Sequence, residues 1–177
     1  MQKQLIVTIT GPDRIGFVES ITKLLLKHNA NVVQSRMVRL GGDFAVLMLV
    51  TVPEPALQAA VQTIGALEAQ GFQVITRGTT SDDKSTFAGW LPYRVSVNGA
   101  DHEGIIHHIA HHLAERGINI ETLTTGSIHA PMSGTQLFTM EAVVLAPPKL
   151  SLKALRSELE SVGNSLSVDT EVMPYTG

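Results

Sequence analysis

The 177-residue sequence predicts an α+β fold of two ferredoxin-like βαββαβ domains in tandem, each an antiparallel four-stranded sheet with both helices on one face. Three observations predict this fold. A short glycine-bracketed motif occurs twice, the spacing between the two occurrences holds for the residues around them, and each copy has the same order of strand-like and helix-like segments. We therefore interpret the chain as a tandem duplication.

The repeated motif is GPDRIG at residues 11–16, which returns as GADHEG at residues 99–104, a shift of 99 − 11 = 88 residues. The same shift aligns Asn29 with Gly117, the residue types that best tolerate the left-handed conformation at a helix end. It also aligns apolar positions on both sides of the motif without a gap: Val7 with Val95, Ile21 with Ile109, and Leu25 with Leu113. Both first helices are expected to end at the same place.

In the first copy, alternation predicts the strands and a 3.6-residue period predicts the helices. Gly41-Gly42 between two strand-like runs is a strong signal for a two-residue hairpin. Gly71 is expected to end the second helix. The expected elements are, in order, a strand at residues 5–9, a helix after the motif, strands at residues 31–40 and 44–52, a helix at residues 56–69 and a strand at residues 72–76.

The second copy repeats this order. Its expected elements are a strand at residues 94–97, a helix after the motif, strands at residues 119–128 and 137–146, a helix at residues 152–162 and a strand at residues 166–173. Between the copies, residues 78–89 are rich in serine, threonine, aspartate and glycine, which is typical of a linker. We therefore expect a first domain at residues 1–78, a linker at residues 79–90 and a second domain at residues 91–177.

The strand at residues 45–52 is apolar on both faces, with Leu47 and Leu49 on one side and Val46, Met48 and Val50 on the other. A strand in an antiparallel sheet with one wet face should alternate instead. We therefore expect the face away from the helices to be covered, either by the other repeat or by a second subunit.

Composition excludes several classes of function. The chain has no cysteine, which rules out disulfide scaffolds, thiol nucleophiles and cysteine zinc sites. Its net charge of −3 leaves no electrostatic footprint for nucleic acid, so a role at a promoter would be indirect. No apolar run approaches the roughly 18 residues of a membrane span, and residues 1–4 lack the apolar region of a signal peptide. We expect a cytoplasmic protein that does not act at a membrane.

The repeated motif has two interpretations. In the simpler one, Asp13 and Asp101 cap the helices that begin near Gly16 and Gly104, and the glycines allow a tight turn. In the other, free N–H groups at the helix start hold a small carboxylate while the aspartate meets an ammonium group, which together fit a free amino acid. A phosphate-binding loop fits poorly, because no lysine follows the glycines and the spacing is neither that of a P-loop nor that of a dinucleotide-binding motif.

A histidine-rich helix follows the second motif, with His102, Glu103, His107, His108, His111 and His112. The spacing is not that of a zincin, because His102 and His107 are five residues apart. With Ile109 at the centre of the buried face, His107 and His111 fall on the solvent side and His108 and His112 on a flank. Neither pair has an evident third ligand, so we favour a polar helix face and expect no metal and no cofactor.

GPDRIGFVESITKLLLKHNANV and GADHEGIIHHIAHHLAERGINIETL resemble ACT domains, small regulatory modules that bind amino acids. The tandem arrangement, with TTGSIHAPMSGTQLFTMEAVVLAP in the second hairpin, is similar to the glycine cleavage system transcriptional repressor family. Phe44 aligns with Phe138, a shift of 138 − 44 = 94 residues, so this hairpin holds six residues more than its counterpart. They form a loop at residues 129–136.

The resemblance implies a protein that is not an enzyme. It implies a homo-oligomer that senses an amino acid, with glycine as the candidate, and that contacts a transcription activator rather than DNA. In ACT domains the ligand lies across an interface between two domains and is held by the loop after the first strand and the asparagine that starts the second. Carried over, the site residues are Gly11, Asp13, Arg14, Gly16 and Asn31 in the first copy, and Gly99, Asp101, Gly104 and Asn119 in the second.

Two other hypotheses remain open from the sequence. One is a metal-dependent enzyme that uses the histidine-rich helix, which metal analysis of untagged protein would test. The other is a purely structural ACT dimerisation module whose loops only cap helices. Titration with the common amino acids separates that module from a sensor.

Overall fold

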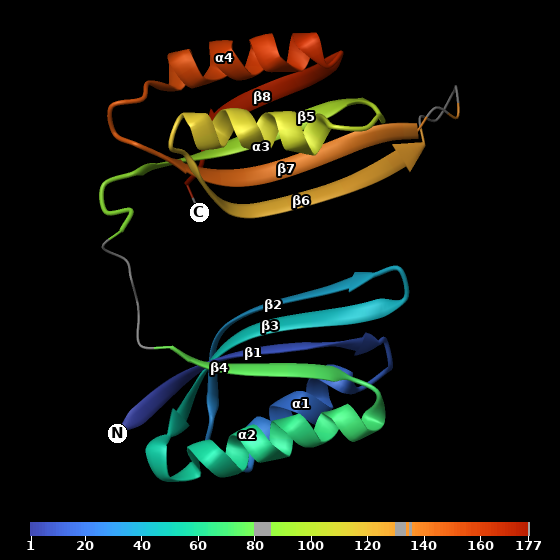
Figure 1. The fold of residues 1–177 in the computed structure, drawn as a ribbon, viewed down its shortest axis with the longest axis vertical. Helices are drawn as coiled ribbons and strands as arrows, with labels where there is room; N and C mark the ends of the chain where they lie inside the picture. The colour runs from blue at the N-terminus through green and yellow to red at the C-terminus, as the bar shows by residue number, and fades with distance from the viewer. Residues whose placement is uncertain (80–85, 130–133, 135, 177) are drawn as a thin grey trace. The chain divides into compact units, whose positions relative to one another are not determined.

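The computed structural model describes residues 1–79, 86–129, 134 and 136–176. The chain separates into two compact units, Met1–Asp82 and Asp83–Gly177. Each unit has a four-stranded antiparallel sheet with two helices on one face (Figure 1), so the predicted fold class is confirmed. Residues 80–85 of the expected linker, and residues 130–133 and 135 of the expected extra loop, lie outside the described residues.

The first unit contains the elements in the predicted order. Its strands pair in the order β2-β3-β1-β4, all antiparallel. The elements are β1 (Gln2–Pro12), α1 (Phe17–Leu26), β2 (Asn31–Leu40), β3 (Asp43–Pro53), α2 (Leu57–Gly65) between the 3₁₀ segments Glu54–Ala56 and Ala66–Gln70, and β4 (Gln73–Thr79).

The second unit repeats this topology with the order β6-β7-β5-β8. Its elements are β5 (Leu91–Ala100), α3 (Ile105–Glu115), β6 (Asn119–His129), β7 (Gln136–Ala146), α4 (Leu152–Ser165) and β8 (Val168–Pro174). Within the described part of the chain, no helix combines the length and the apolar character that crossing a bilayer requires.

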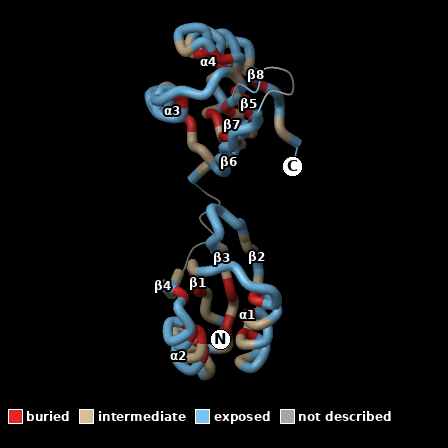
Figure 2. The backbone as a smooth tube through the Cα atoms, turned by 90° about the vertical axis from the view of Figure 1, so that its right-hand side faces the viewer, coloured by how far each residue is buried: buried red, intermediate tan, exposed pale blue. Residues whose placement is uncertain are grey.

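Each unit has its own apolar core between its sheet and its helices, visible as the buried stretches in Figure 2. Positions that the 88-residue shift aligns are buried in both cores, as the pairs Ile21 with Ile109 and Leu25 with Leu113 show. The duplication therefore preserves the packing as well as the order of elements.

The turns follow the sequence signals. Gly41 and Gly42 have φ angles of 62° and 108° and join Leu40 to its partner Asp43, which confirms the two-residue hairpin. Asn29 and Gly117 both have positive φ, 51° and 66°, just after the first helix of their unit. The helix ends are thus set by the same backbone conformation in the two copies.

The central strand β3 has the two-sided apolar character that its sequence indicates. Met48 faces the helices and is 1% exposed, whereas Leu47 on the helix-free face is 49% exposed. The prediction that another surface covers the helix-free face stays a prediction.

Candidate functional site

Gly11 and Gly99 lie in strands rather than in loops, which corrects the expectation that they form the turn. Gly11 is in β1 opposite Phe44, and Gly99 is in β5 opposite Phe138. A Cβ on Gly11 would lie 2.5 Å from Cδ1 of Phe72, and a Cβ on Gly99 would lie 2.9 Å from Cα of Val168. Both glycines therefore let the strand end pack closely against the neighbouring strand region.

The expectation that Asp13 and Asp101 cap the helices is wrong. The capping positions are Gly16 and Gly104, with φ of 82° and 92°, and neither helix start has a side-chain cap. Each helix begins after a left-handed glycine, and the motif's aspartate makes no hydrogen bond to the first amides. In α1 the amide of Phe17 donates to the carbonyl oxygen of Arg14 at 3.3 Å, whereas the first amides of α3 have no side-chain cap.

The first loop is held by its own side chains. Asp13 Oδ2 lies 2.9 Å from Nε of Arg39 on β2. Arg14 donates to Oε1 of Gln70 at 2.7 Å, and its guanidinium stacks over the ring of Phe72 with 4.6 Å to the centroid. Both charged residues of this loop are engaged within the unit.

In the second loop, His102 takes the position of Arg14 and reaches the corresponding segment before the last strand. Its Nδ1 lies 3.0 Å from the carbonyl oxygen of Glu103, and its Nε2 lies 2.7 Å from that of Leu166. A carbonyl can only accept, so satisfying both contacts requires the doubly protonated ring. These two hydrogen bonds, with a smaller contribution from Asp101, raise the pKa of His102 above its ordinary value of 6.5.

An open pocket of about 510 Å³ lies beside the second loop and the start of α3. It combines carboxylates, a histidine that favours its charged form, apolar walls and a helix start. The residues that give it this character are Asp101, His102, Glu103, Gly104, Ile106 and Phe138. The pocket has groups that could meet an ammonium group and amides that could meet a carboxylate.

The asparagines do not join the loops within a unit. Asn31 pairs with Thr51, which pairs with Gln4, whereas Gly11 lies seven residues farther along β1. At about 3.4 Å per residue, this separates them by roughly 24 Å along the sheet. In the second unit, Asn119 pairs with Leu145, which pairs with Pro92, and Gly99 again lies seven residues farther along β5. Asn119 is therefore separated from Gly99 by the same distance.

Each asparagine instead lies where the second strand of its unit begins. Asn31 lines a pocket of about 480 Å³ beside the end of α1, with Glu19, Lys23 and Leu26. Asn119 donates from Nδ2 to Oε1 of Glu121 at 3.0 Å. A site that used both a loop and an asparagine would need residues from two domains.

The histidines of α3 separate as the helical pattern predicts. His107, His108 and His111 are exposed, while His112 is half-buried with Nε2 3.3 Å from Oε2 of Glu158 on α4. Glu158 also accepts a hydrogen bond from Arg116. Among the described residues, no group of three or more histidine, aspartate or glutamate side chains is placed to hold a metal ion.

The sequence does not reveal the roles of three residues at the loops. The histidine pattern draws attention to His102 as a metal ligand, although the 88-residue shift aligns it with cationic Arg14. Phe138 aligns with Phe44 through the longer shift, and this alignment is the signal that places it beside the loop. Arg39 is a strand arginine that could meet an anion, but exposed arginines usually face water, and its partner Asp13 is distant in sequence.

An ACT domain family model matches residues 3–74. The UPF0237 protein of Methanosarcina mazei is 33% identical over 69 residues, which cover 38% of this chain and 73% of that protein. The UPF0237 protein of Streptococcus pneumoniae serotype 4 is 31% identical over 78 residues, covering 44% of this chain and 82% of the relative.

Two solved structures resemble the whole chain. A Galdieria sulphuraria protein, described as unknown, is 32% identical with a TM-score of 0.82, and the match covers 99% of this chain and 100% of that one. A candidate glycine cleavage system transcriptional repressor is 20% identical with a TM-score of 0.71, covering 100% of this chain and 99% of the other. At that identity, the second likeness shows the tandem fold alone.

Proposed function

The chain belongs to the ACT domain family, and from that premise we propose that it is a non-catalytic regulatory protein that binds a free amino acid beside its second loop. The observation that carries the proposal is the pocket of about 510 Å³ next to the uncapped start of α3. Glycine is the first candidate ligand.

The chemistry of the pocket supports this ligand class. A free amino acid has a carboxylate and an ammonium group on neighbouring atoms, so its site must offer both signs of charge within a few ångströms. The first amides of α3 and the protonated form of His102, which its backbone hydrogen bonds favour, suit the carboxylate, and the Asp101 carboxylate suits the ammonium group. Ile106 and Phe138 offer apolar surface to a short side chain.

The charged residues of the first loop are paired with other side chains, whereas those of the second loop line a pocket, and this difference favours the second loop as the ligand site. Asp13 is paired with Arg39, and Arg14 is held by Gln70 and Phe72. A ligand at the first loop would have to displace these contacts. In the second loop, Asp101 and His102 line the pocket, and the hydrogen bonds of His102 to backbone carbonyls favour its protonated form.

A regulatory role through a protein partner fits the charge of the molecule. A chain with a net charge of −3 has no electrostatic attraction for DNA phosphates. Control of transcription would therefore pass through a protein partner, for which the resemblance to the glycine cleavage system transcriptional repressor family implies an activator. Because loop and asparagine lie at opposite ends of each sheet, a ligand site that uses both would require residues from two domains, which a homo-oligomer could bring together.

Calorimetric titration of the purified chain with the common amino acids, beginning with glycine, tests the proposal. We expect one or a few amino acids to bind. Asp101→Asn should weaken binding by about tenfold or more, because a hydrogen bond between charged groups contributes roughly 1.5–3 kcal/mol. Asp13→Asn is the matched control at the equivalent position and should leave the affinity unchanged.

If none of the amino acids gave a heat of binding, the result would contradict the proposal and would favour a purely structural ACT module. Equal losses from Asp13→Asn and Asp101→Asn would show that the second loop is not the preferred site.

A further inference from the structure

We propose that His107 and His111 form a two-histidine clamp on the exposed face of α3 that binds one divalent transition-metal ion per chain, with water at its remaining positions. The inference concerns neither an enzyme nor a structural zinc. Both of those need at least three protein ligands, and the described residues offer no group of that size.

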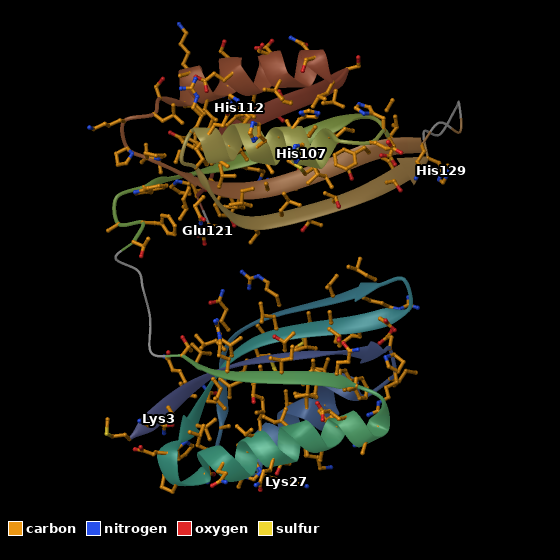
Figure 3. All side chains as sticks on the ribbon, viewed as in Figure 1. Lys3, Lys27, His107, His112, Glu121 and His129 are labelled. Carbon is orange, nitrogen blue, oxygen red and sulfur yellow. The ribbon has the colours of Figure 1, made fainter. Side chains whose placement is uncertain are left out.

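The geometry of the two rings supports the clamp. Residues four apart lie one above the other on a helix face. The ring centroids of His107 and His111 are 5.9 Å apart and the ring planes differ by only 15°, so the two imidazoles lie one above the other with nearly parallel planes. Both residues are exposed, and Figure 3 shows His107 on α3. An ion can therefore approach both rings from solvent without opening the fold.

Imidazole nitrogen is a favourable ligand for Zn²⁺, Ni²⁺ and Cu²⁺. With metal–nitrogen bonds of about 2.0–2.1 Å and tetrahedral angles, two donors on one ion lie roughly 3.4 Å apart. The rings reach this arrangement by tilting about their own side-chain torsions, which exposed residues adjust at little cost.

The surrounding charge favours a cation. Glu115, one further turn along the same face, has Oε1 3.4 Å from Nε2 of His111. Its carboxylate adds negative charge beside the clamp and can accept a hydrogen bond from a metal-bound water.

The other histidines of the helix are not placed to join. His112 contacts Glu158 and its side chain is only 18% exposed. The ring of His108 is turned by 65° from that of His107 and lies beside Gly104, where its Nε2 would be 3.6 Å from an added Cβ. In the first unit, the positions equivalent to His107 and His111 are Glu19 and Lys23, which form an ion pair at 3.7 Å. The clamp is therefore specific to the second copy.

Calorimetric titration of the untagged full chain with ZnCl₂ and with NiCl₂ at neutral pH tests the clamp. We expect one ion per chain. His107→Ala and His111→Ala should each weaken binding by at least about tenfold, because even the loss of an outer-shell partner costs 10- to 100-fold. His108→Ala is the control and should bind like the parent chain.

Absence of binding by the parent chain would overturn the inference, as would unchanged affinity in the His107→Ala, His111→Ala double variant. An equal loss in His108→Ala would also overturn it. Circular dichroism spectra that match the parent chain exclude misfolding as the cause of a loss. His107 also lines the pocket beside the second loop. Because the titration uses the metal alone, without an amino acid, its result does not depend on whether an amino acid binds there.

Discussion

At the scale of single residues, Gly11 and Gly99 are needed for packing rather than for a turn. Neither position has the positive φ that favours glycine. A Cβ at Gly11 would collide with Phe72, and a Cβ at Gly99 would collide with Val168. Glycine therefore occurs at this position in both copies because, in each unit, the backbone passes too close to the start of the last strand to leave room for a side chain.

We predict that Gly99→Ala destabilises the second unit by about 1–3 kcal/mol, the usual cost of overpacking. The new Cβ would lie 2.9 Å from the Cα of Val168, and a backbone atom cannot move aside as a side-chain end can. Chemical denaturation measures the change. Gly78→Ala in β4 is the control, since a Cβ there meets nothing within 4 Å. Equal stability of Gly99→Ala and the parent chain would contradict this packing.

His102 and Arg14 show how two different cations fill one structural position. Each follows the motif's aspartate and reaches the segment between the second helix and the last strand of its unit. Arginine keeps its charge at every ordinary pH, whereas histidine titrates. Of these two cations, only His102 should therefore change its charge near neutral pH.

We predict that His102 titrates above 6.5, because its protonated form donates to the carbonyls of Glu103 and Leu166. A raised folded-state pKa means that the contribution of His102 to stability is fully present below its unfolded pKa and is lost as pH rises through its folded pKa. NMR titration of the imidazole measures this directly. His102→Asn should lower the melting temperature more at pH 5.5 than at pH 8.5, and a midpoint at or below 6.5 would contradict the prediction.

The sequence indicates which loop residues matter but not what each one does. Asp13 and Asp101 lie beside helix starts, so capping was a reasonable expectation from local pattern. Asp13 instead pairs with Arg39, and Gly11 packs on Phe72, contacts between residues far apart in the chain. Roles that depend on such contacts are set by tertiary packing, which neither spacing nor propensity encodes.

At the scale of elements, the helices next to the motif loops begin differently from the other two. α1 and α3 start at left-handed glycines without a side-chain cap, α2 starts at right-handed Ala56 without one, and α4 starts at Ser151, whose Oγ accepts from the amide of Ala154 at 3.1 Å. The two glycine starts border the motif loops, and the starts of α2 and α4 lie away from them. The missing cap at α3 leaves amides beside the pocket.

We predict that Ser151→Ala destabilises the second unit by about 1 kcal/mol, the typical cost of losing an N-cap. Thermal or chemical denaturation measures the difference. Ser157→Ala, at an exposed position inside the same helix, should be neutral or slightly stabilising because alanine is the better helix former. A Ser151 variant as stable as the Ser157 variant would show that the cap contributes nothing.

Most element boundaries follow from local chemistry and were predictable. The Gly41-Gly42 hairpin and the helix ends at Asn29 and Gly117 rest on backbone conformations that few residues adopt. The strands run longer than predicted, because β1 continues through Gly11 and Pro12 and β5 extends to Ala100. These additional residues pair with β3 and β7. The sequence does not reveal this pairing, because the alternation of apolar and polar residues that marks a strand stops at the motif.

At the scale of the whole molecule, duplication has produced two copies of one scaffold with different loop chemistry. The cores use equivalent positions, and the strand order is the same. The first loop carries an internal ion pair, and the second carries a titrating histidine beside a pocket. This difference is the basis for assigning amino-acid binding to the second copy.

The most direct test of that assignment is an NMR titration of isotope-labelled protein with the amino acid that binds most tightly in calorimetry. The account predicts that the largest amide shifts fall on residues 101–107 and on Phe138, with smaller changes at residues 13–19. Shifts centred on the first loop, or no localised shifts at saturating amino acid, would contradict it.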